Sequence, residues 1–278
     1  MSKAKLGAAV LLSSIATTSY AADFTKADEL YAAREGSVAN TVAAREAYEA
    51  IISNGAEGAD LERAAIGIMR TLIYEGEALT GRESDADVEK RRALFKECAD
   101  ETSDLISPDA LGYTTPTHYY FKASCMAYYA EVSGTLENLT NAPRLLSALS
   151  KGLETKGGDT YEGGGLKRVK AAVKSNSKAK PIPGGLYNPE EALTLIDESI
   201  NAKAYPGNYD GLMFCENYRR KINVLTELNR VQDAVVVAES TLEDFAFYLE
   251  LGEVPNSLVP ETKHCLTVVE GLKANLTK

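Results

Sequence analysis

Tryptophan is absent from this chain of 278 residues, and histidine occurs only twice, at positions 118 and 264. Two separated histidines offer few zinc ligands, and the sequence has no Gly-x-Ser-x-Gly elbow, His-Glu-x-x-His helix or dinucleotide fingerprint. His264 adjoins Cys265, but neighbouring side chains on a helix point about 100° apart, whereas a nucleophilic dyad needs a hydrogen bond. We therefore predict a non-enzymatic protein without metal or cofactor. A hydrolase built on this pair is the alternative.

Basic charge and long apolar runs are also scarce. The chain has 30 Lys and Arg residues against 40 Asp and Glu residues, so its formal net charge is −10. This balance argues against nucleic acid or an anionic membrane surface as a partner, and it suits a basic protein partner. After residue 21 no apolar run has the length that crosses a bilayer, so we expect no stable membrane insertion.

The first 21 residues have the three parts of a secretory signal peptide. Two lysines precede an apolar run over residues 6–12, and residues 19–21 (Ser-Tyr-Ala) form a small-x-small cleavage pattern. We predict that residues 1–21 are a signal peptide and that residues 22–278 form a single, exported helical-repeat domain. An uncleaved anchor is the alternative. Removal of the first 21 residues, which carry two lysines and no acidic residue, lowers the net charge from −10 to −12.

Four cysteines, at positions 98, 125, 215 and 265, allow three disulfide pairings. In an exported protein we favour Cys98–Cys125 and Cys215–Cys265, because each pair would join neighbouring helices of one region. Such a bridge stabilises a fold by about 3–4 kcal/mol in the chain-entropy picture. Four buried thiols on apolar helix faces are the alternative.

Small and apolar residues recur at helical spacing along the chain. Within residues 44–52 and 61–72 they stand at i, i+3, i+4 and i+7, which places them on one face of each of two helices. Two such faces so close in sequence are expected to pack as a hairpin. The same spacing returns in two later segments and predicts an all-α fold of stacked antiparallel hairpins. The residues of these stripes are Ala44, Ala47, Tyr48, Ile51, Ile52; Leu61, Ala64, Ala65, Ile68, Leu72; Ala192, Leu195, Ile196, Ile200; and Val231, Ala234, Val235, Ala238, Leu242.

Prolines and caps predict where several helices begin. We expect one helix to begin at Pro143 and another at Pro189, since proline suits the first helical position. Asn188 would cap the second helix, and Glu191 would reach back to the cap amide.

Residues 156–187 interrupt the helical pattern with glycines and prolines, so we predict an irregular, glycine-rich central segment. At its centre Gly163, Gly164 and Gly165 precede a short basic helix. A phosphate loop would need Gly-Lys-Ser/Thr here, but Leu166-Lys167-Arg168 follows the glycines. The favoured interpretation is a tight turn with positive φ angles, which Arg168 ties to a neighbouring carboxylate.

Four tyrosines in one predicted helix form the candidate recognition surface. Tyrosine offers a rigid apolar ring and a polar tip, which suits a groove for a ligand or a protein partner. Tyr119 and Tyr120 cannot face the same way as Tyr128 and Tyr129, so at least one pair belongs to the core. We expect Tyr119 and Tyr120 to be the exposed pair.

Several of these segments, taken in order, resemble a known family. They are Ala-Asp-Glu-Leu-Tyr-Ala-Ala-Arg-Glu at 27–35, an Ala-Tyr-Glu helix, a Gly-Gly-x-x-x-Arg turn ending at Arg168, and Asn-Pro-Glu-Glu-Ala-Leu at 188–193. This order is similar to that of the TatT family, the periplasmic T component associated with some tripartite ATP-independent periplasmic (TRAP) transporters. The resemblance runs from about residue 27 to residue 245. The family usually has proline where Gly165 stands.

The resemblance implies a tetratricopeptide-like fold, a periplasmic location, association with a periplasmic solute-binding protein, and a homo-oligomer. We therefore predict a non-enzymatic accessory subunit of a TRAP-type transport system that docks a solute-binding receptor and holds a small apolar ligand. A general periplasmic scaffold for peptides or assembly partners is the alternative.

Overall fold

The computed structural model describes residues 22–182, 186–204 and 209–278, and within these ranges every regular element is helical. The predicted signal peptide, residues 1–21, lies outside the described residues, as do residues 183–185 of the predicted irregular segment. The helices in order are α1 (Thr25–Ala32), α2 (Val38–Ser53), α3 (Gly58–Tyr74), α4 (Asp85–Lys96), α5 (Pro108–Leu111), α6 (Pro116–Val132), α7 (Thr135–Glu154), α8 (Tyr161–Ser175), α9 (Pro189–Ile200), α10 (Cys215–Glu227), α11 (Val231–Leu251) and α12 (Val259–Leu276).

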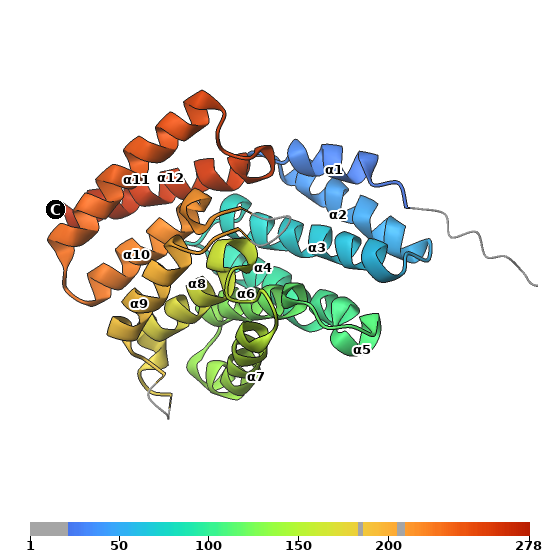
Figure 1. Cartoon of the computed structure of the whole chain (residues 1–278), viewed down its shortest axis with the longest axis horizontal. Helices are drawn as coiled ribbons and strands as arrows, with labels where there is room; N and C mark the ends of the chain where they lie inside the picture. The colour runs from blue at the N-terminus through green and yellow to red at the C-terminus, as the bar shows by residue number, and fades with distance from the viewer. Residues whose placement is uncertain (1–21, 183–185, 205–208) are drawn as a thin grey trace, which may run out of the picture.

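The first hairpin follows directly from the apolar spacing. Helices α2 and α3 pack against each other in opposite directions, and Ala44, Tyr48, Ala64, Ala65 and Leu72 are buried between them and their neighbours (Figure 1). Gly67 lets the Tyr48 ring lie against the backbone of α3, since a Cβ at Gly67 would stand 2.6 Å from that ring. The predicted hairpin is confirmed.

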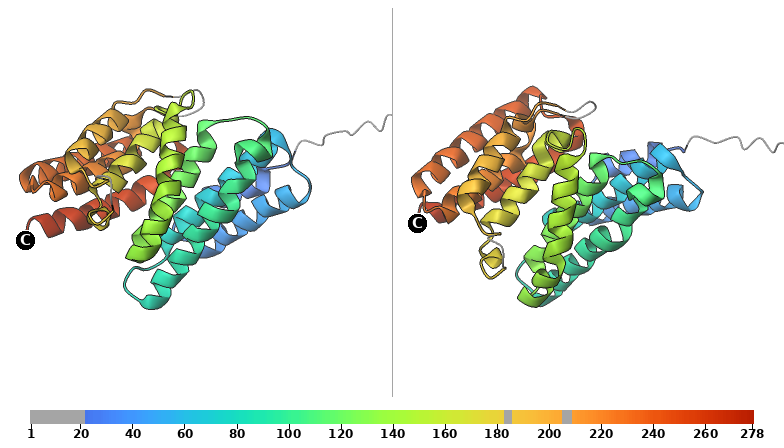
Figure 2. Two further views of the ribbon diagram at one scale, coloured as in Figure 1. Left: turned by 90° about the horizontal axis from the view of Figure 1, so that it is seen from below. Right: turned by 60° about the horizontal axis from the view of Figure 1, so that its bottom comes forward.

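Two large apolar cores lie along the chain, with a smaller cluster formed by Ala171, Ala192, Ile196 and Val224 of α8, α9 and α10. The larger core joins α1–α3 with α6, α7 and α8, and the second joins α10, α11 and α12 around Phe245 and Val269. Figure 2 shows the N-terminal and C-terminal helices at opposite ends, with α6, α7 and α8 between them. None of the described helices is long and apolar enough to cross a membrane.

One disulfide belongs to each core, as the favoured pairing predicts. Cys98 pairs with Cys125 at a Cα–Cα distance of 5.6 Å, and Cys215 pairs with Cys265 at 6.2 Å. The first bridge joins the segment after α4 to α6, and the second joins α10 to α12. Both pairs fit an oxidising compartment.

One buried arginine joins the end of α1 to the start of α12. Arg34, just after α1, is fully buried and donates to the carbonyl of Ser257 at 3.0 Å and to the carboxylate of Glu261 on α12. Its guanidinium lies 3.6 Å from the centroid of the Tyr31 ring. The first helix is therefore attached to the last one.

The predicted helix start at Pro143 is wrong. Helix α7 already begins at Thr135 and continues through Pro143, which lies exposed inside it. The earlier turns are held because the Asn138 amide donates to the carbonyl of Ala130 at 3.0 Å and Ala142 is buried. These contacts offset the loss of the backbone hydrogen bond that proline cannot donate.

Candidate functional site

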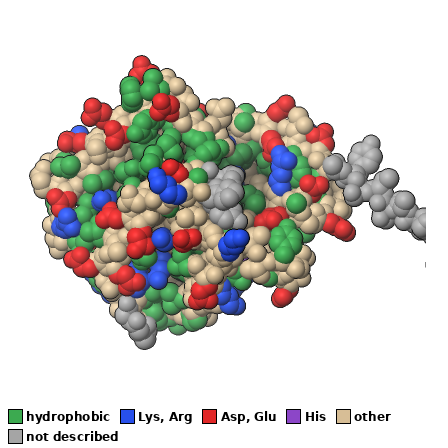
Figure 3. All heavy atoms as spheres, in the orientation of Figure 1, with side chains coloured by type: hydrophobic (Ala, Val, Ile, Leu, Met, Phe, Trp, Pro, Cys, Tyr) green, Lys and Arg blue, Asp and Glu red, His purple; other side chains and the backbone are tan. Residues whose placement is uncertain are grey.

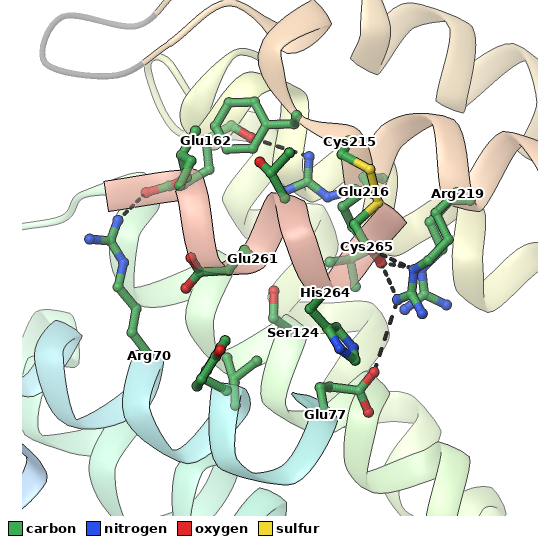
Figure 4. A pocket seen from close by; sticks show the side chains of 18 of the residues that line it. Arg70, Glu77, Ser124, Glu162, Cys215, Glu216, Arg219, Glu261, His264 and Cys265 are labelled. Carbon is green, nitrogen blue, oxygen red and sulfur yellow. Dashed lines mark hydrogen bonds and ion pairs between the residues drawn. A yellow bond between two sulfur atoms is a disulfide. The ribbon is translucent and has the colours of Figure 1, made fainter. Parts of the chain in front are cut away.

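A cavity of about 300 Å³ lies where the two cores meet, and its size falls at the lower end of the range for small-molecule sites. Its walls come from α3 and the π-helical turn after it (Glu75–Leu79), from α6 and α8, and from α10 and α12 (Figure 4). Aromatic and aliphatic side chains supply much of the lining, among them Tyr31, Ile73, Tyr74, Tyr120, Phe121, Tyr128, Val169, Phe214 and Leu258.

Helix α6 contributes one continuous face to the cavity. Tyr120, Phe121, Ser124, Tyr128 and Glu131 follow the i, i+1, i+4, i+8, i+11 pattern that keeps side chains on one side of a helix. The Tyr128 ring stacks on Phe95 with centroids 5.2 Å apart, and the Tyr120 ring meets Tyr161 edge-on at 5.5 Å. These contacts hold both rings at the wall of the cavity.

The expected division of the tyrosines into an exposed pair and a core pair is wrong. Tyr120 and Tyr128 line the cavity, whereas Tyr119 and Tyr129 do not. Tyr119 is half-buried against His118, and Tyr129 is buried with its hydroxyl donating to Glu137. Residues eight apart on a helix share a face more closely than adjacent residues do, so each pair is split.

The glycine turn within the first residues of α8 is left-handed, as its composition predicts. Glu162, Gly163 and Gly164 have φ angles of 49°, 57° and 73°. A Cβ on Gly164 would stand 2.7 Å from Cα of Ser199, so both the backbone angle and the space require glycine there. At Gly165 only the lack of space requires glycine, because a Cβ there would collide with the Tyr120 ring.

Arg168 holds this turn, but its partners differ from the expected carboxylate. Its Nη1 donates to Oδ1 of Asn217 at 2.8 Å and to the carbonyl of Glu162 at 3.3 Å, and its Nη2 donates to the Tyr120 hydroxyl at 3.3 Å. Asn217 in turn donates to the carbonyl of Gly163 at 3.2 Å. The turn is thus fixed by neutral oxygens brought together from α6, α8 and α10.

Ion pairs surround the cavity. Glu162 accepts from Arg70 at 2.6 Å, and Glu216 accepts from Arg219 (Figure 4). Glu216 also accepts from Arg220 at 2.7 Å, and Glu77 accepts from Arg91 at 2.5 Å. Burial alone would raise the pKa of the Glu216 carboxyl, but Arg219 and Arg220 outweigh it and lower that pKa to about 2.

The same balance acts on Glu77. Burial would raise the pKa of its carboxyl, but the nearby Arg219, Arg82 and Arg91 outweigh burial, so the pKa is lowered. These carboxylates are therefore ionised at neutral pH. Each one is compensated by arginine.

Two buried polar atoms at the cavity have no hydrogen-bond partner among the described residues. They are Oγ of Ser124 on α6 and Nε2 of His264 on α12. Burial, and secondly the charge of Arg219, lower the pKa of His264, so its imidazole is neutral at pH 7. Cys265 is bonded to Cys215, so the sulfur beside His264 is not a thiol.

The sequence alone did not identify the charged residues of the site, although it contains some signals. Glu77 follows the apolar stripe of α3, and the π-helical turn that contains it is a type often found at functional sites. Glu216, Arg219 and Arg220 stand at i, i+3 and i+4, a spacing typical of ion pairs on one helix. A surface helix has the same pattern, so burial was needed to identify them. Among the described residues no group of three His, Cys, Asp or Glu side chains is placed to hold a metal ion.

No protein-family model matches the sequence, and no curated protein matches it.

Proposed function

We propose that the chain is a periplasmic, non-enzymatic accessory subunit of a TRAP-type transport system, which holds a small, largely apolar molecule and docks a solute-binding receptor. The observation that carries the proposal is the aromatic cavity between the two cores. The ordered resemblance to the TatT family supports the transport context.

The chemistry of the cavity favours holding a molecule over transforming it. Nucleophilic catalysis needs a hydroxyl or thiol hydrogen-bonded to a base. Ser124 Oγ and His264 Nε2 each lack a partner, so they are not bonded to each other. The carboxylates that line the cavity are already ion-paired with arginines, which favours a structural role over general acid–base catalysis.

An exposed apolar face on α11 supports a protein partner. Val236, Phe247 and Leu251 are each more than half exposed and lie within about 60° of one another around the helix. Figure 3 shows hydrophobic side chains gathered over α11 and α12. Apolar patches of this kind mark protein interaction sites, including those between copies of one chain.

The experiment mixes purified residues 22–278 with the solute-binding receptor encoded nearest to the gene and measures the mass of the complex by light scattering after gel filtration. We expect a complex that is lost in Phe247→Ser and retained in Leu136→Ser, whose side chain is exposed on α7. Failure of the receptor to bind under conditions that preserve the native oligomer would contradict the docking role.

The α11 face also supports the second candidate, a general periplasmic scaffold for peptides or assembly partners. That function predicts that α11 binds several unrelated exported proteins with similar affinity. A strong preference for the neighbouring receptor in the same gel-filtration assay favours the transport role.

A further inference from the structure

The cavity walls contain acidic side chains that are already paired. Five carboxylates line the cavity, and each is in an ion pair with an arginine. The pairs are Glu77–Arg91, Glu131–Arg220, Glu162–Arg70, Glu216–Arg219 and Glu261–Arg34. To pair with one of these carboxylates, a cationic ligand would have to displace its arginine. Such a displacement is costly, since it leaves a buried arginine without a carboxylate.

The arginines of the cavity offer little more to an anion. Arg70, Arg219 and Arg220 each contact a carboxylate, so a second negative charge would compete with it. Arg168 has no carboxylate within an ion-pair distance among the described residues, but its Nη1 and Nη2 already donate to the neutral oxygens that hold the glycine turn. An anionic head would have to break that turn to bind there.

The hydrogen-bonding capacity that remains is neutral. Ser124, only 4% exposed, and the half-buried ring of His264 reach the cavity from different helices, α6 and α12, with Ser124 Oγ and His264 Nε2 unpartnered (Figure 4). A buried polar atom without a partner costs about 1–3 kcal/mol, and native structures keep few of them. A serine hydroxyl and a neutral imidazole each both donate and accept, which matches an uncharged polar group.

We infer that the cavity takes an uncharged amphipathic molecule, with an aromatic or branched apolar body against Phe121, Tyr128 and Val169 and one hydroxyl or amide group between Ser124 and His264. This inference rests on the proposed ligand-holding function and adds the charge and the head group of the ligand. The paired carboxylates then form a rigid frame around the apolar body, and the neutral head completes the two open hydrogen-bonding positions.

Three probes that share an indole ring and differ in head group test the inference by isothermal titration calorimetry at pH 7.5. Indole-3-ethanol is neutral, indole-3-acetate is an anion and tryptamine is a cation. We expect indole-3-ethanol to bind at least about tenfold more tightly than either charged probe, because desolvating an uncompensated charge is costly. Tighter binding of a charged probe overturns the inference and leaves the ligand-holding function standing. Absence of heat with all three probes overturns the ligand-holding function itself.

Matched variants assign the head group to its partners. Ser124→Ala and His264→Gln are each expected to lower the affinity for indole-3-ethanol by about tenfold, which corresponds to the loss of one hydrogen bond to a buried group. Ser175→Ala and His118→Gln are the controls, since both side chains are buried outside the cavity and already bonded to backbone carbonyls. Ser124→Ala should melt no lower than the parent, because it removes an unpartnered buried hydroxyl. Unchanged affinity in both cavity variants overturns the inference.

Discussion

The hairpin α2–α3 and the glycine turn within the first residues of α8 are held by different contacts. In the hairpin, apolar residues at helical spacing meet partners within about 30 positions of sequence. In the turn, Ser199 donates to the carbonyls of Gly163 and Gly164 from 36 and 35 positions away, and Asn217 reaches Gly163 from 54. Local periodicity thus builds the frame, whereas polar contacts distant in sequence build the cavity wall.

The largest expected effect compares the disulfides of the two cores. Replacing both cysteines by alanine should lower the free energy of unfolding by about 4 kcal/mol for Cys215–Cys265 and by about 3.5 kcal/mol for Cys98–Cys125, because the loops they close span 50 and 27 residues. Urea denaturation of the two double variants measures both losses. A greater loss from the shorter loop would show that packing of the first core outweighs chain entropy.

The next effect separates backbone angle from crowding at the glycine turn. Gly164→Ala should cost about 3 kcal/mol, since alanine there adopts a left-handed angle and also meets Cα of Ser199. Gly36→Ala is the matched control: its φ of 65° is similar, but a Cβ there has no neighbour within 4 Å. We expect the control to lose only about 1 kcal/mol in the same urea titration. Equal losses would mean that the turn is not crowded.

A smaller effect depends on pH and on the ion pairs of the cavity. The pKa of Glu216 is about 2 in the folded protein, below the ordinary value of 4.5. A lowered pKa stabilises the fold above pH 4.5, and this stabilisation is lost as the pH falls towards 2. Glu216→Gln should therefore be about 2–3 kcal/mol less stable than the parent at pH 7 and should approach it near pH 2.

The exposed Glu250→Gln is the control for this titration and should follow the parent at every pH. Melting temperatures measured by circular dichroism between pH 7 and pH 2 make the comparison. A constant difference between Glu216→Gln and the parent across that range would contradict the role of ionisation.

The smallest effect compares two adjacent tyrosines. Tyr120→Phe removes the hydroxyl that accepts from Arg168, and we expect a loss of about 1 kcal/mol. Tyr119→Phe, with no such contact to the turn, should change the free energy of unfolding by less than about 0.5 kcal/mol. Thermal melts of both variants distinguish them, and a larger loss for Tyr119→Phe would place the important hydroxyl outside the cavity.

Much of the helical frame was accessible from the sequence. The stripes around Ala44 and Ala65 predict α2 and α3, and the confinement of cysteines to two regions predicts both disulfides. Asn188 caps α9 as predicted, since its side chain accepts from the amide of Glu191 at 3.1 Å. The carboxylate of Glu191 reaches the side-chain amide of Asn188 at 3.3 Å and pairs with Lys174 at 2.7 Å, while the backbone amide of Asn188 donates to the carbonyl of Lys174 at 2.8 Å, because α8 lies beside α9.

The cavity itself was not accessible in the same way. Tyr120 and Tyr128 share a helix face, but nothing local shows that this face meets α12 and not solvent. Nothing in the sequence distinguishes Ser124, and His264 stands out only beside Cys265; the two become informative together because Ser124 Oγ and His264 Nε2 are both buried without partners. The charged pairs have the same limitation, since Glu77 and Arg219 are 142 positions apart and the sequence does not show that they meet.

The buried guanidinium of Arg34 changes how the array of helices can come apart. A stack whose units touch only their neighbours unfolds progressively from its free ends. Here the end of α1 and the start of α12 share one desolvated cation, so they cannot separate without leaving the Arg34 guanidinium without its carboxylate beside the Tyr31 ring at the cavity wall. Separation of α1 from the start of α12 and opening of the cavity wall at Tyr31 and Glu261 are therefore coupled.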